Sequence, residues 1–459
     1  MRRTMAIFVT AISICALMSP PTTAATAKLA PLVHLEPGPG GFMSPNVSYV
    51  ATIPIDSPGI GARVMQIGAQ RRLYVTGGQG LTIYDVTNPG LPIVLGHLEL
   101  PNFENEDVAV SQDGNTVLIS DYLGAYYMYV IDTTNPAAPA LAGQLLLGDF
   151  GHIVSCIDPA CTWVYGSEGS IIDLHDKTKP VRTSYLWGTQ VGLTNNQMTG
   201  GHNIEVDSAG YVWSDTTPIT MMKVNDYIHP TRMTSGRAPQ SANTAYQHNN
   251  IRPLADQWQP RVPLPVDATP EMIEEDAKLR PGEILLSNGE TNLKTSCSGG
   301  SGPFATYSVR DFDQGAPIQL ADIFRPVSGT YTDGNPAVNE LGCSGHWFTW
   351  RNGIVAAGWY EHGTRFLKVD QATGKISQLG YFQPVVGSAS AAHWVDDEYV
   401  YVVDYERGID ILRFDRSAPI PTRRDFRDSW MAKLGVIDPL AKAERFSCAR
   451  TFRQALKIQ

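Results

Sequence analysis

The sequence predicts an all-β protein, a seven-bladed β-propeller with an N-terminal closing strand and a C-terminal helical tail. Short apolar strands alternate with turns that use many of the 42 glycines and 32 prolines. A period in the forties with several strands per unit is typical of propellers. One histidine position recurs just before a strand at intervals of 50, 46, 98 and 47 residues, at His152, His202, His248, His346 and His393.

The first 27 residues have the features of a cleaved secretory signal. Arg2 and Arg3 precede a short apolar run, and small residues end the segment at Ala27. The run is too short to span a bilayer, and no later segment is a candidate membrane span. We therefore expect cleavage near Ala27 and a secreted or periplasmic protein. Residues 28–47 are rich in Pro and Gly and are expected to form a linker.

The propeller is expected over residues 48–414, and its first two units each contain four short strands. The first unit begins near Ala62 and the second near Glu106. Each has a corner in which an aspartate is followed by Asn-Pro. The aspartate is expected to cap the turn, and proline fixes φ where the strand stops. The corners are 84–89, with Asp85, and 130–136, with Asp132.

These corners resemble the LVIVD repeat, and so does the run Ile171-Ile172-Asp173-Leu174 followed by Lys179-Pro180. The resemblance covers units one to three well and weakens afterwards. It implies a β-propeller that is often exported in bacteria. The family defines a fold and no single activity, so function has to be argued from the site.

Unit five is enlarged by insertions at residues 253–281, 291–303 and 326–341, which explain the 98-residue interval. A short helix is expected at Pro270 to Leu279. Long insertions on a rigid scaffold often carry function. Unit seven has only three strands, and the unpaired strand at 48–53 is expected to complete it, which removes the open edge.

Residues 415–459 form a basic segment with some helical periodicity, expected either to pack on the acidic propeller or to bind a partner. Without the signal segment the chain has 33 basic and 45 acidic residues, a net charge of −12. Such a surface disfavours nucleic acid and anionic membranes. Export permits disulfides, and the proposed pairs are Cys156–Cys161 and Cys297–Cys343, with Cys448 free.

Because first strands line the channel of a propeller, the recurring position predicts a ring of side chains at one channel mouth. Units one and two place Arg63 and Glu106 there, and the others place the five histidines. The ends of the second strands return to the same face with acids that include Asp215 and Glu290. The predicted metal ligands are His152, His202, His248, His346 and His393, and the predicted catalytic residues are Arg63, Glu106, Asp215 and Tyr360.

Two chemistries fit these residues. Neutral imidazoles bind a divalent transition metal such as Zn, Cu or Fe. Alternatively, His–acid pairs act as general acids and bases without a metal, as in a lyase or hydrolase that uses His, Tyr and Arg. The leading hypothesis is a metal-dependent enzyme, an oxygenase, lyase or hydrolase, that acts on a small extracellular molecule. The competing one is a non-catalytic propeller that binds a glycan or a protein through its insertions.

Overall fold

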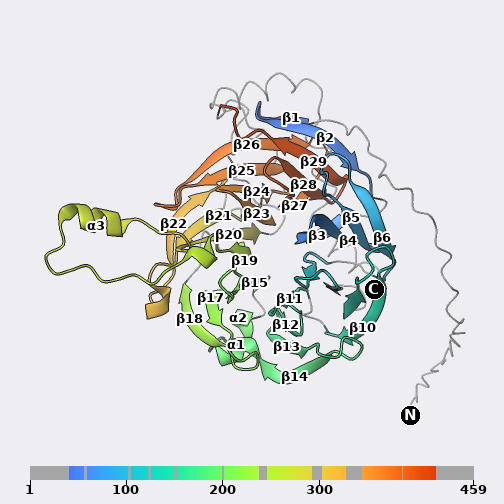
Figure 1. Cartoon of the computed structure of the whole chain (residues 1–459), viewed down its shortest axis with the longest axis horizontal. Coiled ribbons are helices and arrows are strands. Elements are labelled where there is room, and N and C mark those ends of the chain that lie inside the picture. Colours follow the sequence, from blue (N-terminus) through green and yellow to red (C-terminus); the bar gives the residue numbers. More distant parts are fainter. Residues whose placement is uncertain are drawn as a thin grey trace, which may run out of the picture.

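The computed structural model shows seven antiparallel sheets, six with four strands and one with five, arranged as blades around a central axis (Figure 1). It describes residues 41–55, 59–101, 105–121, 126–148, 152–198, 201–236, 245–291, 302–326, 344–384 and 386–419. The predicted seven-bladed propeller is therefore confirmed. The signal segment, the basic segment from residue 420 onward, and Cys297, Cys343 and Cys448 lie outside the described residues.

Each blade runs from an inner strand at the axis to an outer strand at the rim. Blade one consists of β3 (Gly59–Ile67), β4 (Gln70–Gly77), β5 (Gly80–Asp85) and β6 (Ile93–Leu98). Blade two consists of β7 (Ala109–Val110), β8 (Thr116–Ser120), β9 (Tyr127–Asp132) and β10 (Ala140–Leu146). Blade three consists of β11 (Val154–Cys156), β12 (Trp163–Gly166), β13 (Ser170–Asp173) and β14 (Val181–Leu186).

The next two blades follow the same order. Blade four consists of β15 (Ile204–Val206), β16 (Tyr211–Ser214), β17 (Ile219–Lys223) and β18 (Thr231–Gly236). Blade five consists of β19 (Ala245–Ile251), β20 (Ile284–Thr291), β21 (Phe304–Ser308) and β22 (Gln319–Phe324). The helices of the described residues are all short: α1 (Trp187–Gln190), α2 (Asn195–Met198), α3 (Pro270–Ala277) and two 3₁₀ turns at Ala255–Gln257 and Phe312–Gln314.

The last two blades both use N-terminal strands. Blade six consists of β23 (Phe348–Arg351), β24 (Ile354–Gly358), β25 (Thr364–Val369), β26 (Ile376–Pro384) and the added edge strand β1 (Gly41–Met43). Blade seven consists of β27 (Ala389–Trp394), β28 (Tyr399–Asp404), β29 (Gly408–Phe414) and β2 (Val47–Ile53). The closing strand is thus as predicted, whereas β1 lies inside the segment that was expected to be only a linker.

The core lies between the blades. Seven apolar clusters are present among the described residues, and six of them each pack side chains of two neighbouring blades against one another. The one between blades one and two, for example, joins Tyr74 and Ile83 to Val117 and Ile119, all buried. The seventh joins blades seven and one and also includes Ile153 of blade three and Trp347 of blade six. This packing fixes the inner strands relative to one another, and they carry the candidate site.

The aspartates at the repeated corners cap their turns as predicted. Asp85 Oδ1 accepts the amide of Thr87 at 2.8 Å, and Asp132 Oδ1 accepts that of Thr134 at 2.9 Å. The disulfide Cys156–Cys161 is also confirmed. The predicted helix at 270–279 corresponds to α3. None of the helices in the described ranges is long and apolar enough to cross a membrane.

Candidate metal centre

Four histidines from four successive blades surround one carboxylate at the axis. The Oε2 atom of Glu106 lies 3.4 Å from the Nε2 atom of His152, 3.1 Å from that of His202, 3.2 Å from that of His248 and 3.3 Å from that of His346. The Nε2 atoms of His152 and His202 are 2.9 Å apart. All of these ligand-type atoms therefore converge on one small volume.

The backbone explains why the histidines converge. In blades three, four and six an amide at the end of the second strand, or directly after it, donates to a carbonyl at the start of the inner strand. In each case the histidine is the residue directly before the one whose carbonyl accepts this bond. The three imidazoles therefore start from equivalent backbone positions. The pairs are Ser167 to Ile153 at 3.0 Å, Asp215 to Asn203 at 2.9 Å and Gly358 to Trp347 at 2.8 Å.

The tautomer of His346 is fixed by a neighbouring blade. Its Nδ1 atom lies 2.9 Å from the carbonyl oxygen of Ser390 on β27. Because a carbonyl oxygen only accepts, Nδ1 carries the proton when the ring is neutral, and Nε2 then presents a lone pair to the centre. A backbone carbonyl on the far ring nitrogen is a usual partner of a metal-binding histidine.

The site is buried and electrostatically coupled. Burial opposes ionisation of Glu106, but the attraction of His346 and His152 outweighs it and holds the pKa of Glu106 well below its usual value. For His346 burial is outweighed by Glu106, so the pKa of His346 is raised. Burial lowers the pKa of His202 to about 4 and that of His248 well below its usual value. The last two imidazoles are therefore neutral near pH 7.

A second carboxylate and a tyrosine adjoin the four histidines. Glu290 Oε2 lies 3.7 Å from His248 Nε2, and the Tyr360 hydroxyl hydrogen-bonds to the other oxygen of Glu290. The Tyr360 ring lies 4.9 Å from that of His346. Tyr360 has φ of +40°, a conformation disfavoured for tyrosine. Reciprocal backbone bonds to Ala389 at 3.0 and 2.9 Å hold it there.

His393 lies apart from the other four histidines. It pairs with Tyr401, three residues before β28 ends at Asp404. His202 instead precedes Ile204, which pairs with Ser214, the last residue of β16. His393 is thus further along its inner strand, and it does not occupy the position in its blade that the sequence predicts. Burial, with the charge of Arg63, lowers the pKa of His393 to about 3.

Arg63 also lies further along the channel, because it pairs with Tyr74, three residues before β4 ends at Gly77. Its Nη1 atom is 3.7 Å from Asp107 and 3.9 Å from Glu205. Burial raises the pKa of Glu205 to about 7. Asp215 is buried beside Glu205, and burial raises its pKa well above the usual value. Of the predicted catalytic residues, Glu106 and Tyr360 adjoin the histidine cluster, whereas Arg63 and Asp215 join this second group.

Three groupings of the described residues have a geometry that could hold a metal ion: Glu106 with His248 and His346, Glu106 with His152 and His202, and His202 with His248 and Glu290. No family model matches the chain, and no curated protein matches it in sequence. The resemblance to the LVIVD repeat therefore stays an expectation.

Solved structures share the fold. The chain is similar to the β-propeller domain of Cps50 (Swd1) from Myceliophteria thermophila, with a TM-score of 0.51, 12% identity and coverage of 80% of this chain and 99% of that one. It is similar to the same degree, 0.51 and 12%, to hydrazine synthase from Kuenenia stuttgartiensis, with coverage of 80% and 98%. At such low identity the likeness shows the propeller fold alone.

Proposed function

We propose that this protein is a metal-dependent enzyme that acts on a small molecule at one mouth of the propeller channel. Its metal would be a divalent transition ion, bound by His152, His202, His248 and His346 together with Glu106. The observation that carries the proposal is the convergence of four imidazole Nε2 atoms on one carboxylate oxygen.

The distances support metal binding. With metal–nitrogen bonds of about 2.1 Å, neighbouring ligand atoms are about 3.0 Å apart at right angles and about 3.4 Å apart in a tetrahedron. The Glu106–imidazole distances of 3.1 to 3.4 Å and the His152–His202 distance of 2.9 Å match this range. Hydrogen bonding alone explains them less well, because one carboxylate oxygen seldom faces four ring nitrogens at once.

The ligand set favours particular metals. Imidazole nitrogen suits Zn, Cu, Fe and Ni, whereas Mg and Ca prefer oxygen ligands. A single carboxylate among four neutral imidazoles would leave a divalent ion with a net positive charge. Such a centre polarises a bound oxygen atom or lowers the pKa of bound water.

Two features favour catalysis over a structural role for the metal. His152 is 17% exposed at its side chain, while His248 and His346 are fully buried, so the centre is reached from the side of His152. The hydrogen-bonded pair Glu290–Tyr360 adjoins His248 and could take up or deliver a proton. Structural metal sites are usually closed, whereas catalytic ones keep a position for substrate.

Metal analysis tests the first step. The full chain is purified without an affinity tag and its metal content is measured by elemental mass spectrometry. It should contain about one transition-metal ion per chain. A His202→Ala/His248→Ala variant should lose it. The matched control is His175→Ala, because His175 is exposed and bonds only to Asp173 among the described residues. Failure of the wild-type chain to retain Zn, Cu or Fe after incubation with these ions would overturn the proposal.

An open coordination position can be tested without knowing the substrate. The chain is loaded with Co(II) or Cu(II), and azide is added as a small anionic probe. A shift in the visible absorption spectrum is expected if the metal accepts an external ligand. A tightly bound metal whose spectrum azide leaves unchanged would point to a structural centre and contradict the catalytic part of the proposal.

A second candidate is metal-free acid–base catalysis. It is favoured by the opposite pKa shifts of Glu106 and His346, which describe a buried carboxylate–imidazolium pair. Activity that survives complete removal of metal would support this candidate instead.

We further propose that the protein is exported to the periplasm or secreted, which the signal-like first 27 residues and the Cys156–Cys161 disulfide support. Membership of the LVIVD-repeat propellers belongs to the same proposal. A small molecule or a glycan is the proposed ligand of the channel mouth, and a protein partner is an alternative for the insertions.

A further inference from the structure

Blade five carries an arm that extends away from the propeller. Residues 252–283 connect its inner strand β19 to β20, and they include α3 (Pro270–Ala277). Figure 1 shows this segment projecting beyond the rim, with α3 near its far end. The other blades make the same connection with short turns, such as Asn352–Gly353 in blade six. The arm is therefore an addition that the blade does not need for its own sheet.

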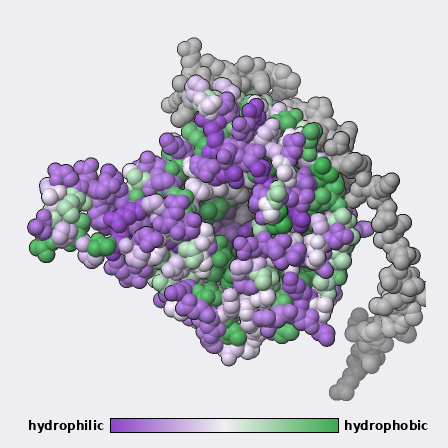
Figure 2. Space-filling view, in the orientation of Figure 1, coloured by the Kyte–Doolittle hydropathy of each residue, from purple (hydrophilic) through white to green (hydrophobic). Residues whose placement is uncertain are grey.

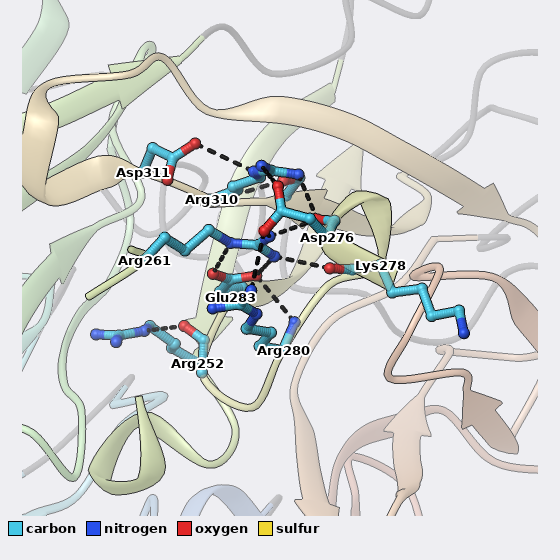
Figure 3. A network of polar contacts seen from close by, with 10 residues as sticks. Arg252, Arg261, Asp276, Lys278, Arg280, Glu283, Arg310 and Asp311 are labelled. Carbon is cyan, nitrogen blue, oxygen red and sulfur yellow. Dashed lines mark hydrogen bonds and ion pairs between the residues drawn. The ribbon is translucent and has the colours of Figure 1, made fainter. Parts of the chain in front are cut away.

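A network of ion pairs links the base of the arm to Asp276, near the C-terminal end of α3, and holds the arm in place (Figure 3). Arg261 bonds to the buried Glu283 and lies 3.0 Å from Asp276. The Nη2 atom of Arg310, in the connection between β21 and β22, lies 2.6 Å from Oδ2 of Asp276. Because these contacts tie the outgoing and the returning segment of the arm to blade five, the arm has a defined direction.

Beyond this base the arm exposes apolar side chains. Val262 is 79% exposed, Val266 fully exposed and Ile273 54% exposed, and α3 has no buried residue at all. In Figure 2 apolar patches lie at the end of the arm among hydrophilic surface. A segment held in place while its apolar side chains face water is expected to be covered by a partner.

The charge of the arm indicates what that partner carries. Residues 262–277 contain five acids and no Lys or Arg. Two such arms would repel each other, which disfavours an arm-to-arm dimer. Residues 420–459 have nine Lys and Arg against four acids, and they include large apolar residues such as Trp430, Leu434 and Phe452. Apolar and basic side chains in one segment complement an apolar and acidic surface.

The point at which the chain leaves blade seven lies on the same face of the propeller as the arm. Arg416 donates to the carbonyl oxygens of Asp397 and Arg351. These residues flank the turns between the first and second strands of blades seven and six. The arm is the corresponding connection of blade five, so it emerges from the same face of the propeller, opposite the histidines. Forty residues can reach about 130 Å when extended, which is ample for one or two blades.

From these relations we propose that residues 420–459 of the chain dock on the arm of the same molecule, covering Val262, Val266 and Ile273 and pairing with its acids. The docked segment would form an accessory layer on the face opposite the candidate metal centre. The proposal is independent of the chemistry at that centre.

Hydrogen exchange on the full chain tests the docking. Peptides from 420–459 should exchange more slowly in the wild-type chain than in a Val266→Ser/Ile273→Ser variant. A Glu271→Lys/Glu274→Lys variant should show the same loss of protection, and so should the wild-type chain at 1 M salt, where surface attraction is screened over about 3 Å. If exchange in 420–459 is the same in all of these chains, the proposal is overturned.

Two controls make the result specific. Val181→Ser removes an exposed valine, 57% accessible, from the rim strand β14 and should leave the exchange of 420–459 unchanged. The measurement is repeated over a tenfold range of protein concentration, together with light scattering. Protection that does not change with concentration supports docking within one molecule. Protection that appears only in a dimer would overturn it in favour of a neighbouring copy.

Discussion

The Nδ1 atom of His346 lies 2.9 Å from the carbonyl oxygen of Ser390, which belongs to the inner strand of the next blade. A side chain of blade six is thus oriented by the backbone of blade seven. The orientation of this imidazole depends on the packing between blades, and the direction in which its Nε2 atom faces Glu106 is fixed before any metal binds.

Alanine substitution should separate two histidines that the sequence presents as equivalent. His346→Ala should reduce the metal content strongly, since it removes a ligand atom 3.3 Å from Glu106. His393→Ala should leave the metal content at the wild-type level, because His393 lies further along the channel. Elemental analysis of both purified variants checks this. Equal loss of metal from the two would contradict the assigned ligand set.

Tyr360→Phe should lower stability without removing the metal. The substitution deletes a buried hydroxyl that donates to Glu290, and loss of a hydrogen bond to a charged group costs about 1.5 to 3 kcal/mol. The measurements are the free energy of unfolding in urea and the metal content. Tyr307→Phe is the control, because the buried Tyr307 hydroxyl has no hydrogen-bond partner among the described residues. This control should cost little or nothing.

The buried Asp404 should make stability depend on pH. Burial, together with the neighbouring Asp410, raises the pKa of Asp404 to about 7, from an ordinary value of 3.8. The folded state therefore keeps a proton that the unfolded state releases between about pH 4 and pH 7, so this group makes stability fall as pH rises through that window. Asn does not titrate, and its side-chain oxygen can still accept the amides of Glu406 and Arg407.

Asp404→Asn should consequently match the wild type near pH 4 and melt higher at pH 8, by about 2 °C or more. Thermal unfolding followed by circular dichroism at several pH values measures the difference. A melting difference that does not change with pH would show that Asp404 is ionised in the folded state over the whole range.

Two ion pairs of the arm should differ sharply in energy. Glu283 is buried and bonds to Arg261, so Glu283→Ala leaves a largely buried guanidinium without its main partner and should cost about 3 to 5 kcal/mol. Glu275 on α3 and Lys278 just after it form an exposed pair, and Glu275→Ala should cost far less than Glu283→Ala. Urea unfolding of both variants provides the comparison, and equal costs would argue against an anchored arm.

Sequence periodicity predicts the fold and most of the candidate centre. Each blade repeats one pattern of strands and turns, so His152, His202 and His346 could be aligned from spacing alone. The same spacing places Glu106 at this position in blade two, and the structure brings its carboxylate to the middle of the imidazoles.

His393 shows why spacing alone is insufficient. It fits the repeat interval, yet it lies three residues before the turn residue Asp396, whereas His152 lies six before Asp158 and His202 five before Asp207. The distance from each histidine to the following turn therefore distinguishes His393 from the others. Asp107 and Glu205 were missed for another reason, since their approach to Arg63 depends on the depth of each inner strand and leaves no local motif.

The N-terminal strand β2 completes the last blade, so the order in which the chain is synthesised determines when the ring can close. It is the first-made strand of blade seven, and it pairs with β29, which ends at Phe414. The ring therefore cannot close until residue 414 has been translated, although blades two to six, which carry Glu106 and the four converging histidines, are complete earlier. A nascent chain thus holds all the candidate ligands while the carbonyl of Ser390, which orients His346, is still to be made.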